Sequence, residues 1–225
     1  MPPVQTIMVT TDFSQFGNQA IPFAGLLAHK LGARLFVCHV IDLPSTPVYE
    51  NVVPGVDDLE RRIKEYAGAA VQKELGGRGP AWETLIATGN PADQAARFCR
   101  QVNADLVVAA THGRSGLERL LLGSVTEQLM HTLPCPLLAV RGPAPDAEKG
   151  FRRILVGVDF SPDSKLAVDW GRTLAQAFEA ELHLAHVIPR SFFADYLTMG
   201  DIPGQEPDEN LLDRIQTELA ALVPD

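Results

Sequence analysis

Hydrophobic and polar positions follow two patterns that alternate along the chain. Short apolar runs rich in β-branched residues predict strands at Thr6–Thr10, Arg34–Ile41, Trp82–Ala87, Ala104–Ala110 and Pro136–Arg141. Apolar residues at helical spacing predict helices at Asn18–Leu31, Asp57–Leu75, Pro91–Val102 and Ser124–His131. Because strands alternate with helices, the pattern predicts an α/β fold, a parallel sheet joined by right-handed crossovers.

The chain also contains an internal repeat, since residues 4–41 recur at residues 151–188. The motif Ile7–Ser14 corresponds to Ile154–Ser161, and the pair His39-Val40 corresponds to His186-Val187. The second copy predicts a strand, a helix, a strand and a helix at Ile154–Val158, Ser164–Phe178, Glu181–Val187 and Glu209–Val223.

The second copy has no counterpart of the third, fourth and fifth strands. We therefore predict a complete domain at residues 1–142, a linker at 143–150 and an incomplete second repeat at 151–225. Two strands and two helices are not expected to be stable alone. Such a half-copy could dock on the first domain, dock on another chain, or reflect truncation of a longer tandem protein.

Charge and composition exclude several classes of function. The net charge is −9 and no segment is rich in lysine and arginine, which argues against a nucleic-acid or anionic-membrane partner. No apolar run is long enough to span a membrane and no signal peptide is evident, so we expect a cytoplasmic protein. The cysteines Cys38, Cys99 and Cys135 share no CxxC spacing and are interpreted as reduced thiols.

Candidate binding residues follow three of the predicted strands. Thr11-Asp12 follows the first strand, Val40 lies near the end of the second, and Ala110 ends the fourth. Ligands of open α/β sheets bind at the carboxyl ends of the strands, near the point where the strand order reverses. These residues therefore predict a binding site at one edge of the sheet.

The segment after the fourth strand has the features of a phosphate-binding loop. Gly113 and Gly123 would allow the backbone to approach an anion, and Arg114 supplies a cation. The helix predicted to begin at Ser124 would offer the backbone N–H groups of its first turn, helped by the helix dipole. The alternative, purely structural interpretation is that both glycines form tight turns in a loop that binds no ligand.

Three motifs carry a resemblance to the universal stress protein family. They are the opening Val9–Ser14, the segment Thr111–Val125 and the segment Pro134–Arg141. The resemblance implies an open five-stranded sheet of order 3-2-1-4-5 with helices on both faces, and a homodimer through strand Pro136–Arg141. One branch of the family binds ATP, with or without Mg²⁺, through Gly-x-x-Gly, nine residues, and Gly-Ser or Gly-Thr.

Carried over to this sequence, that pattern places Gly113, Gly123 and Ser124 at the phosphates and Asp12 and Val40 at the ribose and adenine. Its first glycine is replaced by Ala110. The predicted nucleotide-binding residues are Thr11, Asp12, Val40, Ala110, His112, Gly113, Arg114, Gly123, Ser124, Val125 and Thr126. We predict no metal-ligating residue.

Several of these residues also have simpler interpretations. Asp12 could cap the following helix, and His112 could be a solvated hydrogen-bonding residue. His39 and His186 are expected at strand ends with satisfied ring nitrogens. Ser115 and Ser124 have no visible general-base partner, and we predict no catalytic residue.

Three functions remain open at this level. The first is a cytoplasmic ATP-binding stress-response or regulatory protein, at most a weak ATPase, whose second copy lacks the phosphate loop and does not bind. The second is a nucleotide-free dimeric interaction module that has lost the site through Ala110. The third is an ATP-cleaving ligase-type enzyme, which the absence of a glycine-serine loop after the first strand disfavours.

Overall fold

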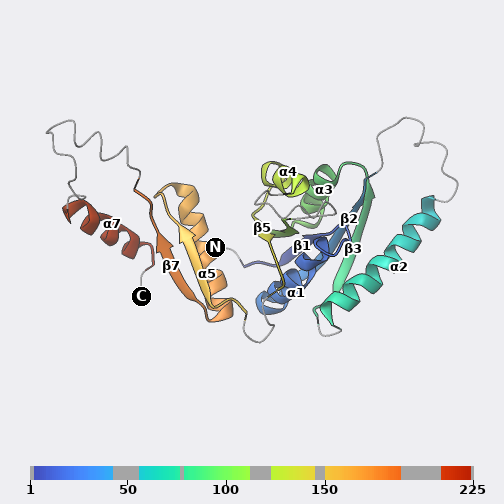
Figure 1. Ribbon diagram of the computed structural model, residues 1–225, viewed down its shortest axis with the longest axis horizontal. Helices are drawn as coiled ribbons and strands as arrows, with labels where there is room; N and C mark the ends of the chain where they lie inside the picture. Colours follow the sequence, from blue (N-terminus) through green and yellow to red (C-terminus); the bar gives the residue numbers. More distant parts are fainter. Residues whose placement is uncertain are drawn as a thin grey trace. The chain divides into compact units, whose positions relative to one another are not determined.

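The computed structural model describes residues 3–42, 56–76, 79–111, 123–144, 150–188 and 209–223. The chain divides into two compact units, Pro2–Glu148 and Lys149–Asp225 (Figure 1). We call these the first and second units. His112, Gly113 and Arg114 lie outside the described residues.

The first unit is built on a five-stranded parallel sheet of order β3-β2-β1-β4-β5, the order that the family resemblance implied. The strands are β1 (Thr6–Thr10), β2 (Arg34–Ile41), β3 (Trp82–Thr88), β4 (Leu106–Ala110) and β5 (Leu137–Val140). Ile7 is in register with Leu35 on one side and Leu106 on the other. The chain therefore reverses its direction of winding between β1 and β4, where ligands of such sheets bind.

Helices cover both faces of this sheet (Figure 1). They are α1 (Ala20–Leu31), α2 (Val56–Leu75), α3 (Pro91–Val102) and α4 (Ser124–Thr132). Helices α1 and α2 contact each other on one face, and α3 and α4 contact each other on the other face. The predicted α/β arrangement with helices on both faces is confirmed.

The central strands form the core because both of their faces are covered. Ile7, Met8 and Val9 of β1 are fully buried, as are Val107 and Val108 of β4. Complete burial of an aliphatic side chain stabilises the folded state by about 1.5–3 kcal/mol. The apolar character of the fourth strand, visible in the sequence, therefore reflects its position inside a parallel sheet.

Several element boundaries differ from the predictions by one or two residues, and two of these differences have a clear local cause. The first helix begins at Ala20 instead of Asn18, because a short 3₁₀ helix, η1 (Gly17–Gln19), precedes it. Strand β4 begins at Leu106 instead of Ala104. Asn103 has a left-handed φ of 51°, and the Ala104 N–H bonds back to Cys99 at 2.9 Å, so these residues end α3.

The second unit contains a parallel pair of strands with two helices. Its elements are β6 (Arg153–Gly157), α5 (Pro162–Phe178), β7 (Glu181–Ala185) and α7 (Glu209–Ala221). Its core is small and consists of Val156, Val158 and Val168 with partly buried neighbours that include Leu219 and Leu222 of the carboxyl-terminal segment. The order strand, helix, strand, helix agrees with the sequence prediction.

The same repeat position has opposite environments in the two units. Met8 is fully buried in β1, whereas its counterpart Leu155 in β6 is 71% exposed. Strand β1 has hydrogen-bonded neighbours on both sides, β2 and β4, while β6 pairs only with β7 among the described strands. The second unit therefore reproduces the order of strands and helices of the first, but its strand β6 is not covered on both sides as β1 is.

None of the helices that the structure describes combines the length and apolar character needed to cross a membrane.

Candidate functional site

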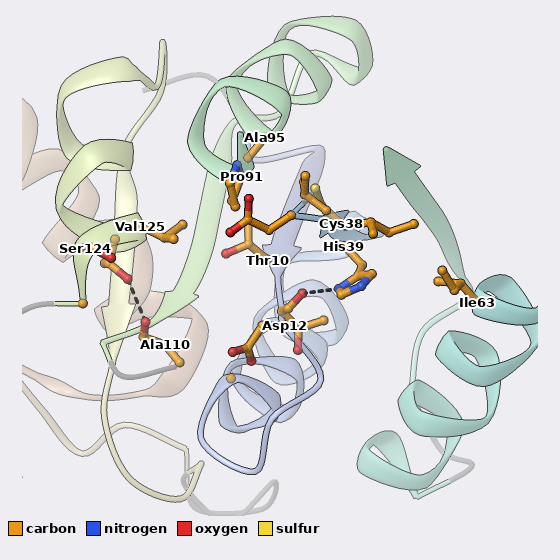
Figure 2. Close-up of a pocket in the computed structure, with 17 residues that line it drawn as sticks. Thr10, Asp12, Cys38, His39, Ile63, Pro91, Ala95, Ala110, Ser124 and Val125 are labelled. Atoms are coloured by element: carbon orange, nitrogen blue, oxygen red, sulfur yellow. Dashed lines mark hydrogen bonds between the residues drawn. The ribbon is translucent and has the colours of Figure 1, made fainter. Parts of the chain in front are cut away.

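A cavity of about 480 Å³ lies at the carboxyl ends of β1, β2 and β4 (Figure 2). It is lined by Thr10, Thr11, Asp12, Gly17, Cys38, His39, Val40, Ile41, Asp42, Ile63, Pro91, Ala95, Ala110, Gly123, Ser124, Val125 and Thr126. All these residues belong to the first unit. The volume is within the range of about 300–1,000 Å³ that is typical of small-molecule sites.

The turn after β1 brings Asp12 to the cavity and holds itself together with local hydrogen bonds. Asp12 Oδ1 accepts from the Ser14 N–H at 2.9 Å, and Ser14 Oγ accepts from the Gly17 N–H at 3.0 Å. The cap of α1 is Gln19, which makes no side-chain capping bond. Asp12 is therefore a turn-forming residue with a carboxylate at the cavity, and the interpretation of Asp12 as a helix cap is wrong.

His39 supports this turn from the neighbouring strand. Its Nδ1 lies 2.9 Å from the carbonyl oxygen of Thr11, and its ring stacks on Phe13 with 4.6 Å between centroids. Phe13 has a φ of 56°, a left-handed conformation that is uncommon for an aromatic residue. The expectation that His39 has a satisfied ring nitrogen is confirmed for Nδ1.

The opposite wall of the cavity combines the end of β4 with the start of α4. The Thr126 hydroxyl donates to the carbonyl oxygen of Ala110 at 2.8 Å, and the Gly123 N–H donates to that of Thr111 at 2.7 Å. A Cβ at Gly123 would lie 3.0 Å from the Thr111 oxygen, which is closer than Cβ atoms normally approach. Glycine therefore allows α4 to start against the end of β4.

Helix α4 directs its amino terminus at the cavity. The N–H groups in the first turn of a helix have no acceptor within the helix, and the helix dipole makes this end positive. Gly123, Ser124 and Val125 all line the cavity, and Figure 2 shows Ser124 and Val125 across from Ile63. This wall is suited to an anion such as a phosphate.

Residues from three further elements complete the lining of the cavity, and sequence reasoning did not find them. Pro91 and Ala95 come from α3 and Ile63 from α2, while Gly17 comes from η1. Pro91 follows the end of β3 after a two-residue turn, so its place at the same sheet edge could have been predicted from the order of elements. Ile63 could not, because it reaches the site only through the packing of α2.

The charged groups that line the described part of the cavity are both acidic. They are Asp12 and Asp42, at the ends of β1 and β2. Carboxylates accept hydrogen bonds from hydroxyl groups, such as those of a sugar. The arrangement therefore separates a carboxylate region from an anion-binding helix terminus.

The structure brings most of the predicted site residues into this one cavity. Those that line it are Thr11, Asp12, Val40, Ala110, Gly123, Ser124, Val125 and Thr126. Among the residues that the structure describes, no group of three or more histidine, cysteine or acidic side chains could hold a metal ion.

The second unit repeats the strand-end geometry of the first. His186 Nδ1 lies 2.7 Å from the carbonyl oxygen of Val158, and its ring stacks on Phe160 at 4.9 Å, with Phe160 also at a positive φ of 63°. Asp159 accepts from the Ser161 N–H at 2.9 Å. Hydrogen bonds from the Ser161 side chain and from its N–H, assisted by Ser164, lower the pKa of Asp159 to about 2.

In comparison with known proteins, a family model matches both units, whereas the curated relatives match about three fifths of the chain. The model of the universal stress protein family matches residues 3–141 and 150–223. A universal stress protein of Methanocaldococcus jannaschii is 30% identical over 141 residues, which is 61% of this chain and 82% of that protein. One of Thermus aquaticus is 31% identical over 141 residues, covering 61% of this chain and 98% of that protein.

Solved structures show the same fold. A universal stress protein from Archaeoglobus fulgidus aligns with a TM-score of 0.64 and 19% identity, covering 97% of this chain and 73% of that one. The UspA protein from Lactobacillus plantarum aligns with a TM-score of 0.53 and 24% identity, covering 63% of this chain and all of that one. The first of these extends over both repeats of the present chain.

Proposed function

We propose that this chain, which belongs to the universal stress protein family, binds an adenine nucleotide in the cavity of its first unit. The observation that carries the proposal is the composition of that cavity. Apolar side chains, a carboxylate and a helix amino terminus line one space at the switch point of the sheet.

The adenine fits the apolar side of the cavity. Pro91 and Ala95 of α3 provide aliphatic surface for a planar base, and Val40, near the end of β2, packs against the apolar cluster that contains Ala95. Backbone N–H and C=O groups there can read the hydrogen-bonding edge of the base. The ribose then lies near Asp12, whose carboxylate accepts from its hydroxyl groups.

The phosphates belong at the amino terminus of α4. The backbone N–H groups of Ser124, Val125 and Thr126 supply donors, and the Ser124 side chain is exposed and available as a further donor. Gly113 and Arg114, which lie outside the described residues, would complete this cradle. We infer ATP as the ligand, with Mg²⁺ reaching the site bound mainly to the phosphates.

Ala110 does not argue against this ligand. The cavity keeps its volume of about 480 Å³ with the alanine side chain in its wall. The Ala110 carbonyl oxygen anchors Thr126, so the backbone at this position serves the start of α4. This observation favours ATP binding over the nucleotide-free alternative.

Hydrolysis of ATP is expected to be slow or absent. His39 is buried with its Nδ1 at the Thr11 carbonyl, and Asp12 holds the turn through Ser14. Neither group is placed as an exposed base that could activate water. We therefore propose a nucleotide-binding regulatory role in the cytoplasm, within the stress response for which the family is named.

We further propose a homodimer that forms through β5. This strand is at the edge of the sheet, next to β4, and its residue Ala139 is exposed. The unpaired groups of an edge strand are a ready surface for pairing with the same strand of a second copy. A monomer in light scattering at micromolar concentration would contradict this part of the proposal.

The test is a calorimetric titration of nucleotide-stripped protein with ATP and Mg²⁺. The expected result is micromolar binding with one site per chain, lost in Gly123→Val because a Cβ there lies 3.0 Å from the Thr111 carbonyl oxygen and must shift the start of α4. The matched control is Gly157→Ala in the second unit, where a Cβ meets nothing within 4 Å. No binding by the intact protein would favour the interaction module instead.

A further inference from the structure

Two of the three cysteines meet inside the first unit. The Sγ atoms of Cys99 and Cys135 lie 3.2 Å apart, although 36 residues separate them in sequence. Cys99 is on α3, and Cys135 lies between α4 and β5. Both belong to the apolar cluster between the sheet and helices α3 and α4, where Leu129 and Val107 are also buried.

The two thiols have different surroundings. Cys99 is buried, whereas Cys135 is half-buried and so closer to solvent. Their mutual hydrogen bond lowers the pKa of Cys99 and raises that of Cys135, and Arg100 further lowers the pKa of Cys99. Burial and the charge of Asp105 act in the opposite direction at Cys99. Cys135 therefore holds its proton more tightly than Cys99 does.

Cys38 provides an internal comparison. It is buried in β2, and burial raises its pKa to about 12. A thiol in such surroundings is chemically inert, because the thiolate is the reactive form. Reagents that react with thiolates should therefore modify the pair, through Cys99, in preference to Cys38.

We propose that Cys99 and Cys135 are a redox pair that forms a reversible intrachain disulfide when the protein meets a hydroperoxide. A disulfide needs the sulfur atoms at about 2.05 Å, so they must approach by roughly 1 Å from their present 3.2 Å separation. Cys99 lies in the last turn of α3 and Cys135 in the short segment between α4 and β5, and α3 and α4 already contact each other.

The chemistry balances with hydrogen peroxide as the oxidant. The sulfur of one cysteine attacks the peroxide, an S–O bond forms, the O–O bond breaks, and the departing hydroxide takes up the thiol proton as water. The second sulfur then attacks the first, the S–S bond forms, and hydroxide leaves and is protonated by the second thiol proton. Two thiols and one peroxide thus yield one disulfide and two waters.

The disulfide would close a loop that contains one half of the candidate nucleotide site. Residues 99–135 include β4, the segment of Gly113 and Arg114, and all of α4. Helix α3, which carries Cys99, also places Pro91 and Ala95 in the cavity wall. Oxidation would therefore tie α3, with its cavity residues Pro91 and Ala95, to the segment between α4 and β5. The inference stands on the sulfur geometry and does not require that a nucleotide binds.

The experiment treats the full chain with a small excess of hydrogen peroxide and maps the products by mass spectrometry without reduction. The expected product is a monomeric chain lighter by about 2 Da, with Cys99 and Cys135 in one cross-linked peptide. Free thiols after unfolding fall from three to one, which is three minus the two in the bond. Dithiothreitol restores all of them.

Cysteine variants test whether the cross-link is specific to Cys99 and Cys135. Cys135→Ser and Cys99→Ser should each abolish the cross-linked peptide, while Cys38→Ala should retain it. The oxidised protein should melt at a temperature higher by roughly 5 °C, because the bond constrains the unfolded chain. Three free thiols after treatment, a cross-link between chains, a sulfinic acid at Cys135 alone, or a lower melting temperature would overturn the proposal.

Discussion

His39 donates its Nδ1 proton to the carbonyl oxygen of Thr11, at a distance of 2.9 Å. A carbonyl oxygen can only accept, so the bond requires the tautomer with the proton on Nδ1. The bond ties the end of β2 to the turn after β1, and this turn presents Asp12 to the cavity. The equivalent bond from His186 to Val158 shows that the repeat preserves this support even in the second unit.

Replacement of His39 should destabilise the first unit. We expect His39→Ala to lower the free energy of unfolding by about 2 kcal/mol, because a buried carbonyl group loses its donor and Phe13 loses its stacking partner. His39→Asn keeps a donor near the Nδ1 position and should recover part of the loss. Urea unfolding of the three proteins measures the difference, and equal midpoints would show that the bond is dispensable.

The hydroxyl of Thr126 should matter more than that of Thr132. Both donate to a backbone carbonyl, Thr126 to Ala110 at 2.8 Å and Thr132 to Gln128 at 3.0 Å, but Thr126 is buried and Thr132 is exposed. Thr126→Val is expected to cost about 1–2 kcal/mol of stability and to weaken ATP binding, since α4 loses its anchor to β4. Thr132→Val should change neither quantity measurably in denaturant unfolding and calorimetry.

Equivalent positions in the two repeats should respond differently to truncation. Met8→Ala removes a fully buried side chain and is expected to cost about 2–5 kcal/mol, whereas Leu155→Ala removes one that is 71% exposed and should change stability by no more than about 0.5 kcal/mol. Chemical denaturation of the full chain measures both. A large loss for Leu155→Ala would mean that the exposed face of β6 is covered in solution.

Cys38 should resist alkylation in the native protein. Its pKa is raised to about 12 by burial, so the reactive thiolate is scarce at pH 8 and becomes abundant only as the pH approaches 12. Because the folded state holds this proton more tightly than the unfolded state, its contribution to stability is fully present below about pH 9 and is lost as the pH rises towards 12. Iodoacetamide labelling between pH 7 and 10, read by peptide mass, tests this. Rapid labelling of folded protein at pH 8 would contradict the assigned burial.

The sheet and its helices were largely predictable because local signals agree with the packing. Strand β2 and helix α3 match their predicted bounds. For α3 the reason is visible, since the Asn90 side chain accepts from the N–H groups of Ala92 and Asp93 while Pro91 occupies the first helical position. The start of β4 was misplaced because Ala104 looks like a strand residue, although its N–H completes the end of α3.

The candidate site was predictable where it consists of strand ends and not where it depends on packing. Asp12, Val40 and Ser124 follow or begin elements whose order already fixes the edge of the sheet that they occupy. Ile63 enters the cavity only because α2 packs beside the sheet, and no local motif marks it. The contact between Cys99 and Cys135 could not be predicted either. Sequence motifs indicate metal-binding or redox cysteine pairs only when the two residues are close together in the sequence.

The most direct test of the central claim is amide-resolved NMR of the full chain during titration with ATP and Mg²⁺. We predict saturable shifts for the amides of Ser124, Val125 and Thr126, with further shifts at Thr11 and Val40 and none along β6. This result would place the phosphates at the amino terminus of α4 and leave the second unit silent. Shifts confined to the second unit, or unchanged amides at the start of α4 under saturating ATP, would contradict the account.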